Sequence, residues 1–181
     1  KYNSAKLARV FINNGYPWLA VSILEPKESE ISEYVEGLYY LGRAYVESGQ
    51  YDRGIEVLEK SLGLGHMETE ILWAMSRAYV GKNDLDSAIK TYSEAVTSAG
   101  KDITKDLAEE YISFLLKNKQ YLKAGESVTT MLTTAQPAFL YIFGIQSNYE
   151  LNEYNKIDYY LEQLRKLPLS EDEKKEYLYW N

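Results

Sequence analysis

The feature that most constrains the fold of this chain is a self-similarity with a period of 34 residues. The segment LGRAY at 41–45 recurs as MSRAY at 75–79, and each is followed by a turn and a second helical pattern. In that second pattern Gly54 and Ala88 keep the same offset, and one step back reaches Ala20. An ordinary helical bundle with accidental periodicity would not keep one offset at several positions. The register therefore predicts consecutive helical hairpins that begin near residues 1, 35 and 69.

The three units also share an order of side-chain sizes. Each unit has a small residue in the first helix, an aromatic residue three positions later and a turn residue between the helices. These are Ala8, Phe11 and Gly15 in the first unit, Gly42, Tyr45 and Gly49 in the second, and Ser76, Tyr79 and Asn83 in the third. Glycine and asparagine suit the left-handed turn that ends a helix. This order resembles the tetratricopeptide repeat (TPR), a helix–turn–helix of 34 residues. The resemblance implies an all-α fold, an α-solenoid of stacked hairpins.

We expect about five repeats in a single array over residues 1–181. Their approximate bounds are 1–34, 35–68, 69–102, 105–137 and 138–170. Pro26 predicts a short second helix in the first repeat and a longer connection over residues 27–30. Ser170 and Glu173 form a capping-box pattern that opens a terminal helix over 171–180. This helix either caps the last repeat or is the first helix of a sixth.

One stripe of the first helices carries an arginine in each of the first three repeats. Positions 2, 5, 9 and 12 of a repeat lie three or four residues apart, on a face separate from the packing positions. In the resembled family this stripe lines the concave groove that holds extended peptides. The candidate binding residues are Arg9, Tyr39, Tyr40, Arg43, Trp73 and Arg77. Arginine pairs with carboxylates bidentately, and aromatic residues anchor interfaces.

Two alternatives bear on this stripe. Glu36, Glu70 and Asp106 follow the arginines at the start of the next repeat, so the arginines could be internally ion-paired. In the fourth repeat the stripe is acidic, with Asp106 and Glu109. The groove is therefore expected to be basic and aromatic at one end and acidic at the other.

The composition and net charge of the chain make some classes of binding partner unfavourable. The chain has 27 acidic and 20 basic side chains, a formal net charge of −7, and no Lys/Arg-rich run. That field disfavours nucleic acid and anionic membrane surfaces. No apolar run approaches the roughly 18 residues of a membrane span, and the first residues lack the pattern of a signal peptide. The compartment is not predicted.

The sequence carries no pattern of an enzyme. It contains no cysteine, and its single histidine, His66, falls in a turn. No glycine-rich phosphate loop and no metal-ligand spacing occurs. We therefore expect no catalytic residue, no metal and no cofactor.

The predicted function is protein–protein interaction: a scaffold or adaptor that binds an extended segment of a partner, with acidic groups or a free C-terminal carboxylate. One alternative is structural, with self-association through the ends of the array or through Tyr177, Tyr179 and Trp180. Another is a non-catalytic regulatory part of a larger protein.

Overall fold

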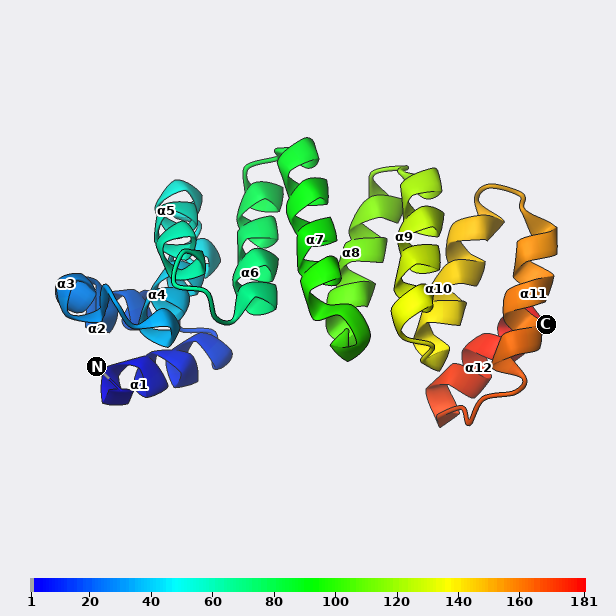
Figure 1. Cartoon of the computed structure of the whole chain (residues 1–181), viewed down its shortest axis with the longest axis horizontal. Coiled ribbons are helices and arrows are strands. Elements are labelled where there is room, and N and C mark those ends of the chain that lie inside the picture. Colours follow the sequence, from blue (N-terminus) through cyan, green and yellow to red (C-terminus); the bar gives the residue numbers. More distant parts are fainter. Residues whose placement is uncertain (1) are drawn as a thin grey trace. The chain divides into compact units, whose positions relative to one another are not determined.

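The structure, a computed structural model, describes residues 2–181 as helices joined by short loops, with no strand in that range (Figure 1). The predicted all-α class is therefore confirmed. The chain divides into two compact units, which meet between Ser98 and Ala99, and each is described by itself. Within residues 2–181 no helix has the length and apolar character needed to cross a bilayer.

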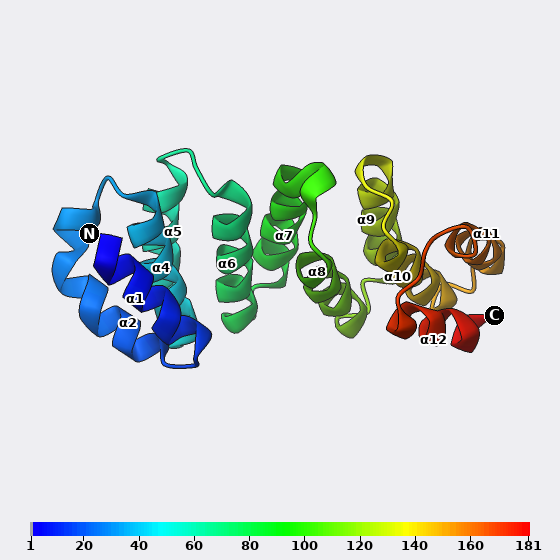
Figure 2. The ribbon, with the colours of Figure 1, turned by 90° about the horizontal axis from the view of Figure 1, so that it is seen from below.

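The first unit consists of three helical hairpins (Figure 1, Figure 2). They are α1 (Tyr2–Asn13) with α2 (Pro17–Leu24), α4 (Val35–Glu47) with α5 (Tyr51–Leu62), and α6 (Glu68–Gly81) with α7 (Leu85–Ala99). Pro17 opens α2 at a position where a helix does not use its backbone N–H. The hydroxyl of Thr69 donates to that of Ser98 at 3.0 Å, which ties the start of α6 to the end of α7.

The second helix of the first hairpin is short, as Pro26 predicts, and the longer connection that follows is itself helical. Residues 25–31 form a 3-10 turn, η1 (Glu25–Lys27), and a short helix, α3 (Glu28–Ile31). The side chain of Ile31 is fully buried in the core shared by α1, α2 and α4. Burial of this one apolar residue holds the segment in helical form, an effect that the position of Pro26 alone does not predict.

The second unit contains two further hairpins and a terminal helix (Figure 1). After the 3-10 turn η2 (Gly100–Asp102) come α8 (Lys105–Lys117) with α9 (Tyr121–Thr134), α10 (Ala138–Tyr149) with α11 (Tyr154–Leu164), and α12 (Glu171–Trp180). The capping box that opens α12 is present: Ser170 N donates to Glu173 Oε2 at 2.8 Å, and Glu173 N donates to Ser170 Oγ at 3.3 Å.

The terminal helix packs on the last hairpin of the second unit. Tyr177 and Trp180 on one side of α12 pack against the apolar core of α10 and α11, and the Trp180 ring lies 5.2 Å from that of Tyr149. Leu178 and Tyr179 point away and are 72% and 78% exposed. The helix therefore covers the core with two aromatic side chains and leaves an apolar pair in solvent.

Every hairpin turns through a residue with left-handed backbone. The φ angles are 78° at Gly15 and Gly49, 57° at Asn83, and 58° at Lys119 and Asn152. Only glycine adopts this region without steric cost, and asparagine tolerates it. The turn residues predicted for the first three repeats thus have the expected conformation, and Lys119 holds the same geometry with an unfavourable side chain.

Small residues allow the paired helices of the second hairpin to cross closely. A Cβ atom added at Gly42 of α4 would lie 2.6 Å from Leu58 Cγ and 3.2 Å from the Gly54 carbonyl oxygen of α5. One added at Gly54 would lie 2.6 Å from Val46 Cγ2. Since real Cβ atoms do not approach other atoms so closely, the crossing depends on glycine at both positions.

Candidate functional site

The predicted binding residues lie on the first helices of the three hairpins of the first unit. Arg9 lies on α1, Tyr39, Tyr40 and Arg43 on α4, and Trp73 and Arg77 on α6. Arg9 is exposed and forms no ion pair with any residue in the range 2–181. The other five are half-buried, except Tyr39, which is buried.

On α4 two adjacent tyrosines, Tyr39 and Tyr40, precede Arg43 by four and three residues. The rings of Tyr39 and Tyr40 lie 5.0 Å apart. Burial raises the pKa of the Tyr39 hydroxyl, and the positive charge of the nearby Arg43 guanidinium counteracts part of that rise. Arg43 Nε donates to Glu47 Oε1 at 2.7 Å, and both side chains remain about a quarter exposed, at 23% and 28%. The guanidinium is therefore oriented on its own helix and still reaches solvent.

On α6 the same spacing places Arg77 over Trp73. The guanidinium carbon lies 4.6 Å from the centroid of the indole ring, a cation–π contact. The indole Nε1 is buried and has no hydrogen-bond partner within residues 2–181. A buried donor without an acceptor costs about 1–3 kcal/mol.

Two of the acidic neighbours expected for the arginines, Glu36 and Glu70, do not pair with Arg9 and Arg43. Arg43 pairs with Glu47, one turn further along α4, and not with Glu70. The Glu36 carboxylate accepts a hydrogen bond from the Tyr34 hydroxyl at 2.6 Å, and burial together with this contact raises the pKa of Tyr34. Because residues four apart on a helix face each other, Glu47 reaches Arg43 without any contribution from the next repeat.

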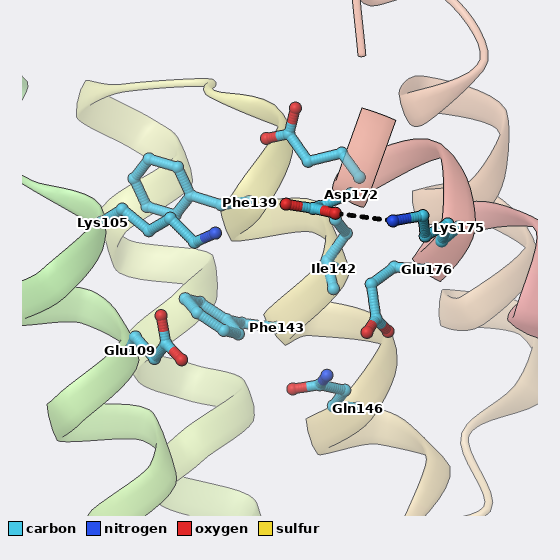
Figure 3. Close-up of a pocket in the computed structure, with 10 residues that line it drawn as sticks. Lys105, Glu109, Phe139, Ile142, Phe143, Gln146, Asp172, Lys175 and Glu176 are labelled. Atoms are coloured by element: carbon cyan, nitrogen blue, oxygen red, sulfur yellow. Dashed lines mark hydrogen bonds and ion pairs between the residues drawn. The ribbon is translucent and has the colours of Figure 1, made fainter. Parts of the chain in front are cut away.

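A second candidate site, in the second unit, was not predicted. A pocket of about 320 Å³ opens between α8, α10 and α12 (Figure 3). Its apolar wall is formed by Phe139, Ile142 and Phe143 of α10, with the two phenyl centroids 6.1 Å apart. Its charged residues come from α8 and α12 and include Glu109, which belongs to the acidic stripe of the fourth repeat. The signal that could have found it is the pair of phenylalanines four residues apart.

The carboxylates of this pocket fall into two groups, and Lys105 and Lys175 are its cations. Glu173 accepts from Ser170 N at 2.8 Å and belongs with the paired group. Asp172 Oδ1 accepts from Lys175 Nζ at 3.0 Å, and Lys175, with a smaller contribution from Lys105, lowers the pKa of the Asp172 carboxyl. By contrast, Glu109 and Glu176 form neither an ion pair nor a side-chain hydrogen bond with any residue that the structure describes. The pocket therefore has one neutralised part and one with uncompensated negative charge.

No cluster of metal-binding side chains occurs within residues 2–181, and His66 lies exposed in the turn before α6.

Known proteins agree with this architecture. The sequence profile of the tetratricopeptide repeat matches residues 35–64 and 69–102, the second and third hairpins. No curated protein sequence is significantly similar to the chain. Among solved structures, a kinesin light chain protein from Podosopora anserina with nearly identical TPR-like repeats aligns at a TM-score of 0.65 and 17% identity, covering 91% of this chain and 93% of its own.

Two further structures show the same fold. MamA from AMB-1 aligns at a TM-score of 0.62 with 18% identity and covers 94% of each chain. A thermophilic TPR protein from Thermus thermophilus aligns at 0.58 with 16% identity and covers 99% of this chain and 97% of its own. At such identities the likeness concerns the fold alone. The chain therefore contains tetratricopeptide repeats at residues 35–64 and 69–102, a repeat whose general role is protein–protein interaction.

Proposed function

We propose that this chain is a binding scaffold that holds an extended segment of a partner protein against the first helices of its hairpins. The observation that carries the proposal is a repeated pair: an aromatic residue four positions before an arginine, on both α4 and α6. On α6 the indole contacts the guanidinium, which holds Arg77 in one orientation; on α4 the Arg43 guanidinium is near enough to Tyr39 to counteract part of the rise in the pKa of its hydroxyl. Such pre-positioning lowers the entropy that a ligand must remove on binding.

The chemistry of the pairs favours a carboxylate in the partner. Arg43 and Arg77 present planar donors that match a carboxylate bidentately. The existing Arg43–Glu47 pair is partly exposed and lies within one helix, so it contributes only about 0.3–0.5 kcal/mol. A charge-assisted hydrogen bond to a ligand contributes about 1.5–3 kcal/mol, so an acidic side chain or a C-terminal carboxylate can displace Glu47.

The remaining candidates flank these pairs. Tyr40 packs beside Tyr39 and offers a half-buried ring, and Arg9 is an exposed cation on the preceding hairpin. In this proposal Arg9 adds long-range attraction for an acidic segment, while Tyr40 adds apolar contact area.

The test is a binding screen with acidic peptides and with peptide pairs that differ only in a free or amidated C-terminus. An Arg43→Glu/Arg77→Glu variant is compared with Lys90→Glu/Lys123→Glu, which makes the same change in charge at exposed positions of α7 and α9. We expect acidic or free-carboxylate peptides to bind wild type and the lysine variant, and to lose at least tenfold in affinity with the folded arginine variant. Equal losses in both variants, or no preference for carboxylates, would refute the role of the arginines.

A second candidate function, structural self-association, is supported by the exposed face of α1. Leu7 and Val10 are 45% and 51% exposed. The residues 34 positions on, Leu41 and Ala44, are fully buried, because α2 packs on α4. This face of α1 is therefore apolar and uncovered within residues 2–181.

Sedimentation velocity over a range of protein concentrations tests this candidate. If the α1 face joins two copies, the mean mass rises with concentration in wild type and in a Leu122→Glu control, whose leucine is 63% exposed on α9. The Val10→Glu variant then stays monomeric. A constant monomer mass for all three proteins would exclude self-association through this face.

A further inference from the structure

We infer that the pocket between α8, α10 and α12 is a binding site for an arginine side chain of a partner segment, with an apolar residue next to that arginine. The inference rests on the proposed role as a peptide-binding scaffold. It extends that role to the second unit and to a ligand group of opposite charge. It does not depend on the arginines of the first unit.

The first argument is the shape and lining of the pocket. A volume of about 320 Å³ lies at the lower end of the range for ligand sites, which suits one or two side chains. Phe139 is half-buried, while Phe143 and Ile142 are 7% and 6% exposed, so these side chains form a fixed apolar wall. An aromatic wall attracts the flat face of a guanidinium and the methylene groups that carry it.

The second argument is the placement of the uncompensated charge. Glu109 projects from α8 and Glu176 from α12 into the same pocket, with Phe143 and Gln146 of α10 between them (Figure 3). Both carboxylates lack a partner within residues 2–181. A guanidinium between them would donate to both, and the Gln146 side-chain carbonyl is a further acceptor.

The third argument is that another carboxylate of the pocket is already paired with a lysine. Asp172 is also a carboxylate of this pocket, but Lys175 already satisfies it at 3.0 Å. The negative charge available to a ligand is therefore confined to the side of Glu109 and Glu176. An acidic ligand would meet two unpaired carboxylates there, whereas a basic one is favoured both locally and by the net charge of −7.

Arginine is preferred over lysine on geometric grounds. Its guanidinium is planar, so it can lie against a phenyl ring and donate sideways to two carboxylates at once. A lysine ammonium is a compact, strongly hydrated charge that can pair with the carboxylates but gains less from the aromatic wall.

The experiment uses the full chain and fluorescein-labelled nonapeptides of Gly and Ser with a central Leu-Arg pair, both ends blocked. Analogues replace the arginine with lysine, with glutamate, or with citrulline, which keeps the shape of arginine but carries no charge. Fluorescence anisotropy compares wild type with Glu109→Gln, Glu176→Gln and a matched control, Glu126→Gln, at an exposed glutamate of α9 outside this pocket.

We expect the arginine peptide to bind most tightly, the citrulline peptide at least fivefold more weakly, and the glutamate peptide not at all. Glu109→Gln and Glu176→Gln should each weaken binding of the arginine peptide about three- to tenfold, as expected for loss of one partly exposed charge-assisted contact. Glu126→Gln should leave it unchanged. Added salt should weaken the arginine peptide and not the citrulline peptide.

Equal binding of arginine and citrulline peptides, equal effects of all three glutamine variants, or no binding of the arginine peptide would each overturn the inference. Failure of the proposed function in the first unit is distinguishable, because the Arg43→Glu/Arg77→Glu variant leaves this pocket intact. If that variant still binds the arginine peptide as wild type does, the pocket acts independently of the first unit's site.

Discussion

The substitution Gly42→Ala tests the close crossing of α4 and α5 directly. A Cβ atom at position 42 would meet Leu58 Cγ at 2.6 Å and Cδ2 at 2.9 Å, and the carbonyl oxygen of Gly54 at 3.2 Å. Leu58 is fully buried in a close-packed core, so the helices must separate or Leu58 must leave its rotamer.

The expected size follows from two opposing terms. In a helix interior, alanine is favoured over glycine by about 0.8–1.0 kcal/mol. Forcing an extra methyl group into a packed core costs about 1–3 kcal/mol, and this crossing belongs at the upper end because backbone as well as side-chain atoms are in the way. Gly42→Ala should therefore lower the free energy of unfolding by about 1–2 kcal/mol.

Gly125→Ala is the matched control, since it makes the same change in the interior of α9. There the added Cβ would lie 3.8 Å from Asn148 and 3.9 Å from Leu151, at ordinary van der Waals contact. Only the helix-propensity term acts, so this variant should be stabilised by up to about 1 kcal/mol. Urea and thermal denaturation followed by circular dichroism and tryptophan fluorescence measure both, with Trp18 and Trp73 in the first unit and Trp180 in the second.

A double-mutant cycle identifies the cause. Leu58→Ala by itself should cost about 2–5 kcal/mol, but it removes the atoms with which the new methyl group collides. In that background Gly42→Ala should be neutral or stabilising. Two results would contradict this explanation: Gly42→Ala stabilises the wild-type chain as Gly125→Ala does, or it lowers the free energy of unfolding equally in both backgrounds. In either case the close crossing of α4 and α5 is not the reason that position 42 requires a small residue.

Three further substitutions test separate parts of the structure. Lys119→Gly should raise the free energy of unfolding by about 1 kcal/mol in a urea titration, because a φ of 58° is sterically strained for lysine and not for glycine. Ser61→Ala should lower it by about 1 kcal/mol, since the buried hydroxyl donates to the Val35 carbonyl at 3.0 Å. Hydrogen bonding to Arg53 lowers the pKa of Glu56 from 4.5 to about 2, so the unfolded state takes up this proton first as the pH falls. Wild type should therefore lose stability between pH 4.5 and 2 to a greater extent than Glu56→Gln in acid titrations, and equal losses would exclude this contribution.

The hairpins were predictable because the residues that a hairpin requires all lie within one repeat. A left-handed turn residue and a small residue at the helix crossing recur at one offset, and the structure has φ of 78° at Gly49 and close packing at Gly42. These requirements are satisfied within a single hairpin. A sequence period therefore reports them directly.

Features that depend on side-chain choice or on non-repeated elements were not predictable to the same degree. The expected partner of Arg43 was Glu70, yet Glu47 takes that place, because several acidic residues are within reach and the rotamer decides between them. The binding role of the arginine stripe stays a prediction.

The pocket of the second unit illustrates the limit most clearly. The repeat pattern indicated Glu109 as part of an acidic stripe. Phe139 and Phe143 neighbour Glu109 because α10 packs beside α8, but Glu176 joins them only because α12 packs across α10. The angle at which a terminal helix packs is set by the whole surface beneath it. No period in the sequence encodes that angle.

The central claim is that a partner segment binds on the first helices of the hairpins. Backbone amide NMR shifts of the isotopically labelled chain, titrated with the best acidic peptide of the screen, test it most directly. The account predicts saturable shifts concentrated on α4 and α6, around Tyr39, Arg43 and Trp73, and lost in the folded Arg43→Glu/Arg77→Glu variant. Shifts confined to the second helices α5 and α7, or unchanged in that variant, would contradict it.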